Sequence, residues 1–382
     1  MGIVGIAPRS HTLSRWSLPA TDLADMSTHV ILNSGAMMPL IGLGTWEAAP
    51  GEVHAAVLAA LEAGCRHIDC ASAYRNEAEV GEALISSGVK RDELFITSKL
   101  WNDRRRPGDV RDALETTLSE LQLDYLDLFL IHYPVAWQRG SFMKPDRLAS
   151  LKETWRTLEQ LVEEGKCRSI GVSNYKREEL EMLLQYAQIP PAVNQIELHA
   201  RLPQKDLVLF CLSKGIGVTA YSPLGRGSAK NASVLESLQV RSIAAAHQVS
   251  AAAVLLRWNI QRGVAVIPKS VTPHRIAQNM QQPNSFELSA ADMAIIDAFS
   301  DGHRICTVLW STFDDKSNLE RAAATIIAMV MTAIFSVLYI DVTRRGLEIV
   351  GIRWFATEPE RREVKRSAPQ PPPTEVEDAP AS

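Results

Sequence analysis

Residues 65–74 read CRHIDCASAY, a short apolar strand that ends in Asp69 and is followed five residues later by Tyr74. A helical pattern over Glu77–Ser86 comes next. By itself, an aspartate at a strand end more often starts a turn or caps a helix than takes part in chemistry. The stretch decides the fold because its order, a strand ending in a polar residue and then a helix, recurs along most of the chain.

This recurrence predicts an α/β protein. After a predicted β-hairpin over His29–Leu40, strand-plus-helix units follow one another. Eight units are predicted: Ile41–Gly44 with Glu52–Ala63, Arg66–Asp69 with Glu77–Ser86, Leu94–Lys99 with Asp109–Leu121, Leu126–His132 with Leu151–Glu164, Ser169–Ser173 with Arg177–Ala187, Val193–Glu197 with Gln204–Lys214, Val218–Ser222 with Ser233–His247 and Ala251–Gln261, and Val264–Lys269 with Pro273–Asn279. Eight such units predict a parallel sheet closed into a (β/α)8 TIM barrel.

The strands themselves support this prediction. Leu128–Ile131 is continuously apolar, as expected for strands covered on both faces. An open dinucleotide-binding sheet is the weaker alternative, because the sequence after the first strand, Gly42-Leu43-Gly44-Thr45-Trp46-Glu47, lacks the third glycine of that fold's phosphate-binding turn.

Composition excludes several classes of protein. The 382 residues are 46% hydrophobic and carry a formal net charge of -4, which gives no electrostatic reason to bind nucleic acid. The five cysteines include no Cys-x-x-Cys pair, so the sequence predicts neither a disulfide framework nor a metal site. A reducing compartment, the cytosol, fits this cysteine usage.

Polar residues end or follow neighbouring strands of the predicted barrel. Asp69, Lys99 and His132 end the second, third and fourth strands, and Tyr74 lies on the loop after the second. The carboxyl ends of barrel strands meet at one mouth, so we expect these side chains to lie together. Lys99 would favour the phenolate of Tyr74, Asp69 would be the counter-ion of Lys99, and His132 would orient a carbonyl or relay a proton.

Each of these residues also has an ordinary structural interpretation. Lys99 could be solvated, His132 could be a core histidine with its hydrogen bonds satisfied, and Tyr74 could pack against the barrel wall. Their convergence at one predicted mouth favours a joint role in protonating a carbonyl oxygen.

Three separated motifs resemble the aldo-keto reductase family over about residues 28–306. They are Cys65–Asp69, Phe95–Trp101 and Leu130–Pro134. The resemblance implies that Asp69, Tyr74, Lys99 and His132 form the family's catalytic tetrad, with Tyr74 as general acid. It also implies NADPH-dependent reduction of aldehydes or ketones.

Further strand ends resemble the family's cofactor site. The resemblance implies cofactor contacts by Thr45, Trp46, Ser173, Asn174, Gln195, Tyr221, Ser222 and Leu224. Around the start of the last predicted helix, it implies that Lys269, Ser270, Thr272 and Arg275 hold the 2'-phosphate of NADP, with Gln278 and Asn279 near the adenine. Cations beside a helix N-terminus suit a phosphate, so NADPH is preferred over NADH.

Trp46, Trp101 and Tyr133 follow strand ends and would line the mouth with aromatic surface. Such a surface favours small apolar or aromatic carbonyl compounds, or sugars that stack on a ring. The barrel is expected to act as a monomer.

The two ends of the chain do not fit the barrel. Residues 1–27 are expected to be a disordered or targeting extension, and residues 311–321 a polar linker. Residues 322–340 contain no charge and predict a transmembrane helix, a helix packed against the barrel being the main alternative. Residues 341–382 are charged and rich in proline, which predicts disorder.

Two functions are therefore open. The first is a carbonyl reductase whose barrel lies in the cytosol, anchored to a membrane by 322–340. The second is a cofactor-binding regulatory or scaffold subunit tethered to a membrane partner. The complete tetrad favours the reductase, because a sensor has less need of it.

Overall fold

The computed structural model describes residues 28–46, 48–49, 51–141, 144–227 and 234–306. The chain divides into two units, Met1–Trp310 and Ser311–Ser382, and all described residues belong to the first. The predicted extension 1–27, linker 311–321, membrane helix 322–340 and tail 341–382 lie outside the described residues, so they stay predictions.

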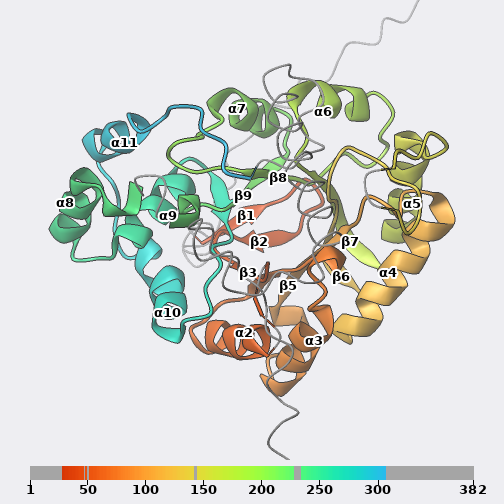
Figure 1. Ribbon diagram of the computed structural model, residues 1–382, viewed down its shortest axis with the longest axis horizontal. Helices are drawn as coiled ribbons and strands as arrows, with labels where there is room; N and C mark the ends of the chain where they lie inside the picture. The colour runs from red at the N-terminus through yellow and green to blue at the C-terminus, as the bar shows by residue number, and fades with distance from the viewer. Residues whose placement is uncertain (1–27, 47, 50, 142–143, 228–233, 307–382) are drawn as a thin grey trace, which may run out of the picture. The chain divides into compact units, whose positions relative to one another are not determined.

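A closed barrel of parallel strands forms the centre of the first unit (Figure 1). Each strand pairs in parallel with the next, in the order β3 (Leu43–Gly44), β4 (His67–Asp69), β5 (Phe95–Leu100), β6 (Leu126–Ile131), β7 (Cys167–Ser173), β8 (Val193–Glu197), β9 (Gly217–Tyr221) and β10 (Val264–Val266). A parallel bridge between Ile41 and Val266 joins the first strand to the last. Hydrogen bonds of 2.9 Å from Gly42 N to Val266 O and 2.8 Å from Val266 N to Leu40 O complete the closure. The predicted TIM barrel is confirmed.

Helices surround this barrel (Figure 1). They are α2 (Glu52–Glu62), α3 (Glu77–Ser86), α4 (Pro107–Leu121), α5 (Leu151–Glu163), α6 (Arg177–Leu184), α7 (Lys205–Ser213), α8 (Leu238–His247), α9 (Ala251–Gln261), α10 (Pro273–Gln281) and α11 (Ala290–Asp297). Short 3-10 turns are η1 (Ser72–Tyr74), η2 (Arg91–Glu93), η3 (Gly225–Gly227), η4 (Val234–Glu236) and η5 (Gln282–Asn284).

Two predicted helices extend beyond the observed ones by three residues or more, the other helix boundaries agree within two residues, and α11 was not predicted. The helix expected from Ser233 begins at Leu238, because the Ser237 hydroxyl accepts a hydrogen bond from Val240 N and caps the helix there. The helix expected to reach Ala187 ends at Leu184.

An antiparallel hairpin covers the amino-terminal end of the barrel. It pairs β1 (His29–Ile31) with β2 (Met37–Pro39), as the sequence predicted. In its turn, Asn33 Nδ2 donates to Pro191 O at 3.0 Å and the hydroxyls of Ser34 and Ser169 lie 2.7 Å apart. Pro191 lies two residues before β8 and Ser169 is in the amino-terminal half of β7, so the hairpin leaves the opposite, carboxyl-terminal face for a site.

Helix α3 packs very closely on the end of α4. A Cβ added at Gly81 would lie 2.5 Å from Glu120 O and 2.8 Å from Leu121 O, closer than real Cβ contacts allow. Glycine is required here by proximity and not by its backbone angles. The two helices are therefore held against one another by their backbones.

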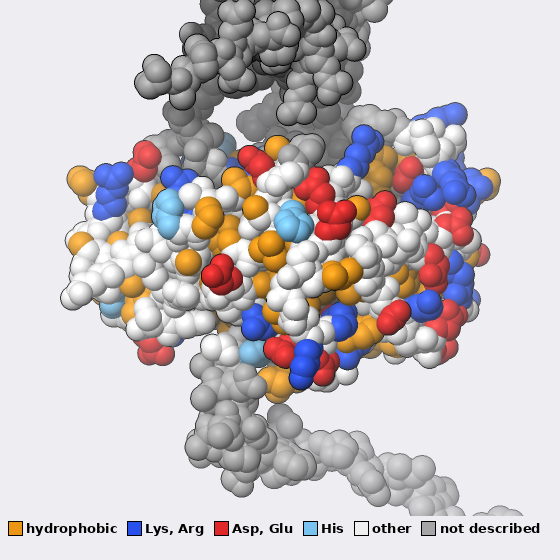
Figure 2. Space-filling view, turned by 90° about the horizontal axis from the view of Figure 1, so that it is seen from below, with side chains coloured by type: hydrophobic (Ala, Val, Ile, Leu, Met, Phe, Trp, Pro, Cys, Tyr) orange, Lys and Arg blue, Asp and Glu red, His pale blue; other side chains and the backbone are white. Residues whose placement is uncertain are grey.

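The outer surface mixes charges of both signs. On the face seen in Figure 2, Lys and Arg side chains are interspersed with Asp and Glu, and hydrophobic side chains lie singly or in small groups between them. In the part of the chain that the structure describes, no helix is both long enough and apolar enough to cross a membrane.

Candidate active site

The predicted tetrad converges at the carboxyl-terminal face of the barrel. Asp69 is the last residue of β4, Lys99 is the penultimate residue of β5, and His132 directly follows β6. Tyr74 ends η1, on the loop after β4. Because side chains alternate along a strand, Lys99 points into the mouth while its neighbour Ser98 points to the helices outside.

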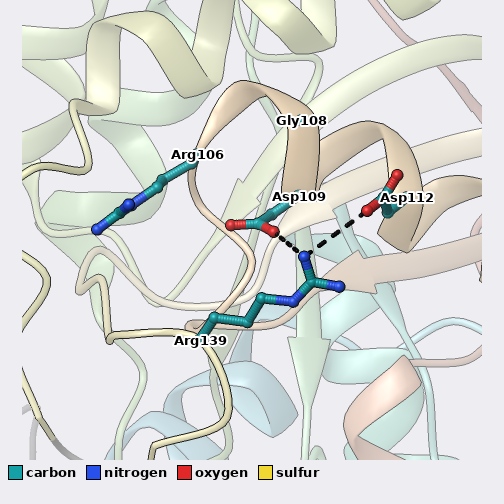
Figure 3. Close-up of a pocket in the computed structure, with 5 residues that line it drawn as sticks. All are labelled: Arg106, Gly108, Asp109, Asp112 and Arg139. Carbon is teal, nitrogen blue, oxygen red and sulfur yellow. Dashed lines mark hydrogen bonds and ion pairs between the residues drawn. The ribbon is translucent and has the colours of Figure 1, made fainter.

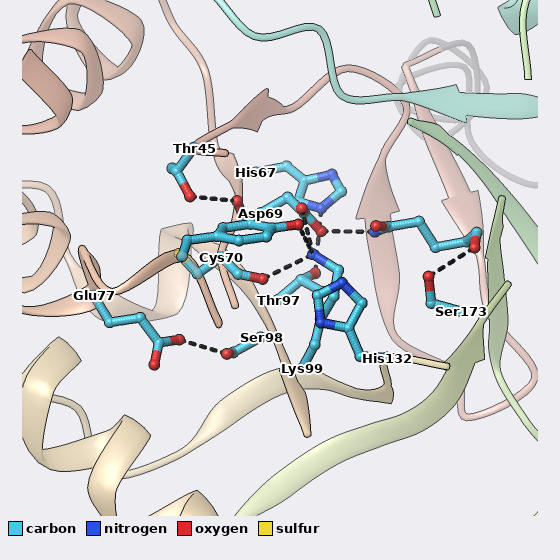
Figure 4. Close-up of polar contacts among 12 residues, drawn as sticks. Thr45, His67, Asp69, Cys70, Glu77, Thr97, Ser98, Lys99, His132 and Ser173 are labelled. Atoms are coloured by element: carbon cyan, nitrogen blue, oxygen red, sulfur yellow. Dashed lines mark hydrogen bonds and ion pairs between the residues drawn. The ribbon is translucent and has the colours of Figure 1, made fainter. Parts of the chain in front are cut away.

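A buried ion pair lies at the centre of this group (Figure 4). Lys99 Nζ is 2.6 Å from Asp69 Oδ2, and the two residues are 1% and 2% exposed. The same ammonium donates to Cys70 O at 2.8 Å and to the Tyr74 hydroxyl at 3.3 Å. The other oxygen of Asp69 accepts from Gln195 Nε2 at 2.7 Å. Burial of both charges is thus compensated by pairing and by further hydrogen bonds.

The pKa of Tyr74 is raised well above its ordinary value, chiefly by burial and then by the charge of Asp69. The expectation that the ammonium of Lys99 would make the phenolate favourable is not met, although the contact itself exists. Lys99 is already neutralised by Asp69, so its charge does not offset desolvation of the phenol. Tyr74 therefore keeps its proton near neutral pH and is poised to donate it.

His132 is a neutral imidazole. Burial, and then the charge of Lys99, lowers its pKa well below the ordinary value. Among the described residues, its buried Nδ1 has no hydrogen-bond partner. Its ring lies edge-on to Tyr74 with centroids 5.9 Å apart and stacks on Tyr133 at 5.0 Å. A neutral imidazole beside the tyrosine ring can orient a carbonyl oxygen by hydrogen bond, but it is not the charged form that would relay a proton.

The ends of β7, β8 and β9 form a connected network beside the tetrad. The Ser173 hydroxyl donates to Gln195 O at 2.9 Å, and Asn174 Nδ2 donates to His132 O at 2.9 Å. The Tyr221 hydroxyl donates to Asn174 Oδ1 at 2.7 Å. The predicted cofactor residues of these strands are thus brought together, and Gln195 is additionally bonded to Asp69.

Residues after β3 and β9 lie at the same mouth. The Thr45 hydroxyl donates to Asp69 O at 2.9 Å, which places the following Trp46 beside the tetrad. Ser222, after β9, has a left-handed backbone with φ 50° and lies with its hydroxyl 3.5 Å from Cys306 Sγ. Leu224 is half-buried.

The segment between β10 and α10 carries a set of phosphate donors. Lys269 and Arg275 are exposed, Ser270 and Thr272 are half-buried, and Thr272 is the N-cap of α10 without a capping bond from its side chain. Downstream, Gln278 is exposed and Asn279 is buried.

These donors fit the phosphate of NADPH. They combine two cations, two hydroxyls and the positive end of a helix, which together match a phosphate monoester. The segment also adjoins the mouth, because a Cβ added at Gly44 would lie 2.9 Å from Ile267 O and 3.9 Å from Lys269 Cβ. The predicted cofactor residues therefore run continuously from the mouth to the helix N-terminus.

Aromatic side chains surround the mouth. Trp101 lies edge-on to His132 at 4.9 Å and to Tyr133 at 6.1 Å. On another side, Trp46 is 38% exposed and is covered by the Arg226 guanidinium, 3.7 Å above its ring. The three predicted substrate residues are thus at the site.

Several neighbours of the site were not predicted. Trp137 is buried and packs on Trp101 at 5.6 Å, and Arg226 stacks on Trp46. Trp137 lies in the loop after β6 and Arg226 in the short turn η3, and the strand pattern reveals the shape of neither segment.

The segment after α11 also reaches the mouth. The buried carboxylate of Glu197, at the end of β8, accepts from Ile305 N at 2.6 Å and from Cys306 N at 3.1 Å. Burial raises the pKa of Glu197, but hydrogen bonds from His199 and Ile305 outweigh burial and lower it. The only sequence signal for this contact was an acid at a strand end.

A hollow beside the start of α4 is separate from this constellation (Figure 3). The arginines that line it are paired with carboxylates. Arg139 lies 2.7 Å from Asp109 and 3.8 Å from Asp112, and Arg106 binds Asp146 with two hydrogen bonds. Because these charges satisfy one another, we assign no ligand to the hollow.

Comparison with known proteins agrees with the fold. A model described as the aldo/keto reductase family matches residues 40–301. Aldo-keto reductase family 1 member A1-A of Danio rerio is 44% identical over 297 residues, and member A1 of Mus musculus 45% over 296; each match covers 73% of this chain and 91% of the relative. The solved aldose reductase of Schistosoma japonicum has a TM-score of 0.69 at 43% identity, covering 75% of this chain and 99% of that chain.

We predict that Asp69→Asn lowers the free energy of unfolding by about 3 to 5 kcal/mol, because it leaves the ammonium of Lys99 buried without a counter-charge. Urea denaturation measures the change. Glu181→Gln is the control, since it breaks the exposed Arg177–Glu181 pair of 2.9 Å and should cost less than about 0.5 kcal/mol. Equal losses in the two variants would contradict the role of the buried pair.

Proposed function

The chain belongs to the aldo/keto reductase family, and we propose that it reduces aldehydes or ketones to alcohols with NADPH. The observation that carries this proposal is the Lys99 ammonium, fixed by Asp69 and lying 3.3 Å from the Tyr74 hydroxyl at the mouth of the barrel. A phenol donor, a buried cation and a neutral imidazole in one place suit protonation of a carbonyl oxygen.

Each member of the tetrad has a defined role. Tyr74 donates its proton to the carbonyl oxygen as negative charge develops there, because its raised pKa keeps the proton in place until then. Lys99 donates a hydrogen bond to the Tyr74 oxygen and keeps the hydroxyl in place, and Asp69 holds Lys99 charged and in position. His132 orients the carbonyl oxygen toward Tyr74. NADPH, when bound, supplies the hydride that the carbonyl carbon accepts.

The cofactor would be held along the line of residues described above. Ser173, Asn174 and Gln195 would contact the nicotinamide amide, and Tyr221 would stack on its ring. Ser222 and Leu224 would follow the pyrophosphate. The remaining contacts would come from Lys269, Ser270, Thr272 and Arg275 to the 2'-phosphate, from Gln278 and Asn279 to the adenine, and from Thr45 and Trp46 at the mouth.

We propose that the substrates are small apolar or aromatic carbonyl compounds. Trp46, Trp101 and Tyr133 give the mouth aromatic surface, which binds flat or apolar groups. A single chain supplies all four tetrad side chains, which supports a monomeric enzyme.

The test is turnover of a panel of aldehydes and ketones by the purified protein, followed by the loss of NADPH absorbance. Turnover supports the reductase. Tight NADPH binding without turnover of any carbonyl compound would favour the regulatory or scaffold subunit instead.

Tyr74→Phe should lower kcat by at least about a hundredfold, because it removes the proton donor and leaves the ring in place. NADPH affinity, measured by fluorescence titration, should stay within a few fold of the wild type. Loss of NADPH binding in this variant would contradict the assigned role, since Tyr74 would then be needed for the cofactor and not for the proton.

Arg275→Ala should weaken NADPH binding by roughly ten- to a hundredfold and NADH binding by less than about twofold, because only NADPH carries the 2'-phosphate. Titration with both cofactors measures the difference. Arg241→Ala, which removes an exposed arginine on α8, is the control and should change neither affinity. Equal weakening of NADPH and NADH would contradict a 2'-phosphate site.

We further propose that residues 322–340 anchor the protein in a membrane, with the barrel in the cytosol. The support is their uncharged apolar composition and length. After membrane fractionation and carbonate extraction, the full chain should stay in the pellet, and a chain ending at Arg321 should be in the supernatant. Extraction of the full chain by carbonate would contradict the anchor.

A further inference from the structure

Glu77 is a buried acid that the proposed reaction does not use. It is the first residue of α3, three residues after Tyr74, and it is 1% exposed. Its side chain points toward Ser98 of β5 (Figure 4), although an acid in the first turn of a helix can face solvent and still favour the helix. Burying a carboxylate costs free energy unless it is paired with a charge or hydrogen-bonded.

Two hydroxyls bind the Glu77 carboxylate. Ser98 Oγ donates to Oε1 at 2.5 Å, and Thr117 Oγ1 donates to Oε2 at 3.0 Å. Ser98 is the neighbour of Lys99 in β5, and Thr117 lies in α4. Glu77 thus ties the segment that carries Tyr74 to the strand that carries Lys99.

The contacts around Glu77 reinforce this connection. The preceding residue, Asn76, is buried and donates from Nδ2 to Thr45 O, just after β3, at 2.9 Å. The following turn of α3 is pressed against the backbone of α4 at Gly81. Movement of Glu77 would therefore move the loop of Tyr74 as well.

The charge of Glu77 is not paired with a cation among the described residues. The charged or titratable groups that act on it or feel its charge are Lys99 in β5, Glu120 in α4, and Cys70 and Tyr74 in the segment after β4. The pKa of Glu77 is raised to about 7, because burial raises it by more than the hydrogen bonds from Ser98 and Thr117 lower it. In turn, the Glu77 charge raises the pKa of Tyr74.

We propose that Glu77 is a positioning residue for proton donation: through Ser98 it holds the Tyr74 loop against β5, and it places a buried acid three residues from the proton donor. The inference rests on the proposed reductase function. When Glu77 is protonated, the opposing charge is absent and Tyr74 gives up its proton more readily. Carbonyl reduction is therefore faster below the pKa of Glu77 and slower above it.

The first test measures how the rate constant for a single turnover by the full chain depends on pH. NADPH is in excess, and the substrate is an aldehyde that the protein reduces. The wild-type rate constant should fall by about three- to tenfold as pH rises through about 7. Glu77→Gln should abolish this fall and keep the faster, low-pH rate. Glu79→Gln, which changes the same charge in the same helical turn at a more exposed site, should leave the fall in place.

Removal of a hydrogen bond gives an independent variant in case Glu77→Gln does not fold. Ser98→Ala and Thr117→Val keep the charge of Glu77 but remove a bond that lowers its pKa. The fall in rate should therefore move to higher pH in both. A rate loss in Glu77→Gln that keeps the wild-type inflection, or an unmoved inflection in Ser98→Ala, would overturn the proposal, because a merely structural role predicts those results.

A second readout needs neither NADPH nor turnover. The Glu77 pKa is raised in the folded state above its ordinary value of 4.5, so its protonated form stabilises the fold, fully below pH 4.5 and progressively less as pH rises to about 7. The urea midpoint of the wild type should fall over this range relative to that of Glu77→Gln. If the wild type turns over no carbonyl compound, the reductase function fails, but this readout still tests the buried acid. Urea midpoints of the wild type and Glu77→Gln that change with pH in parallel would contradict the titration of Glu77 over this range.

Discussion

The buried pair of Lys99 and Asp69 is the interaction on which the site depends. Neither charge could lie at the mouth alone, because the desolvation of an unpaired ion in the protein interior costs several kcal/mol. The pair is supplied by adjacent strands, and further strands complete it: Gln195 reaches Asp69 from β8, and Thr45 reaches its carbonyl from the end of β3. Only a closed barrel brings both β3 and β8 to the same aspartate. Closure of the barrel is therefore needed to assemble the site.

This pair also explains why charged and neutral groups coexist within a few ångströms. Lys99 and Asp69 cancel most of one another's field, so Tyr74 and His132 experience burial as the larger effect. Both therefore stay uncharged, Tyr74 by retaining its proton and His132 by losing one. A site with an unpaired lysine would instead favour the phenolate, which is the form unable to donate a proton.

Much of the fold followed from the sequence because its decisive signals are local. Apolar strands of four to seven residues ending in polar residues predicted the barrel, and β8 and α3 have the predicted bounds. The convergence of the tetrad followed from topology alone, since every strand end faces the same mouth. The direction in which the pKa of Tyr74 is shifted could not be predicted from the sequence. It depends on how deeply the hydroxyl is buried and on how fully Asp69 neutralises Lys99. The contacts of Gln195, Trp137 and Glu77 join segments far apart in the chain, so spacing could not reveal them.

The contact between Glu197 and the segment after α11 bears on how the wall of the mouth can change in sequence. Glu197 holds Ile305 and Cys306 by their backbone N–H groups, which every residue except proline possesses. The backbone of this part of the wall is therefore fixed independently of the side chains that it presents. Residues 305 and 306 can be exchanged to reshape the wall of the mouth while the strand that anchors them stays unchanged.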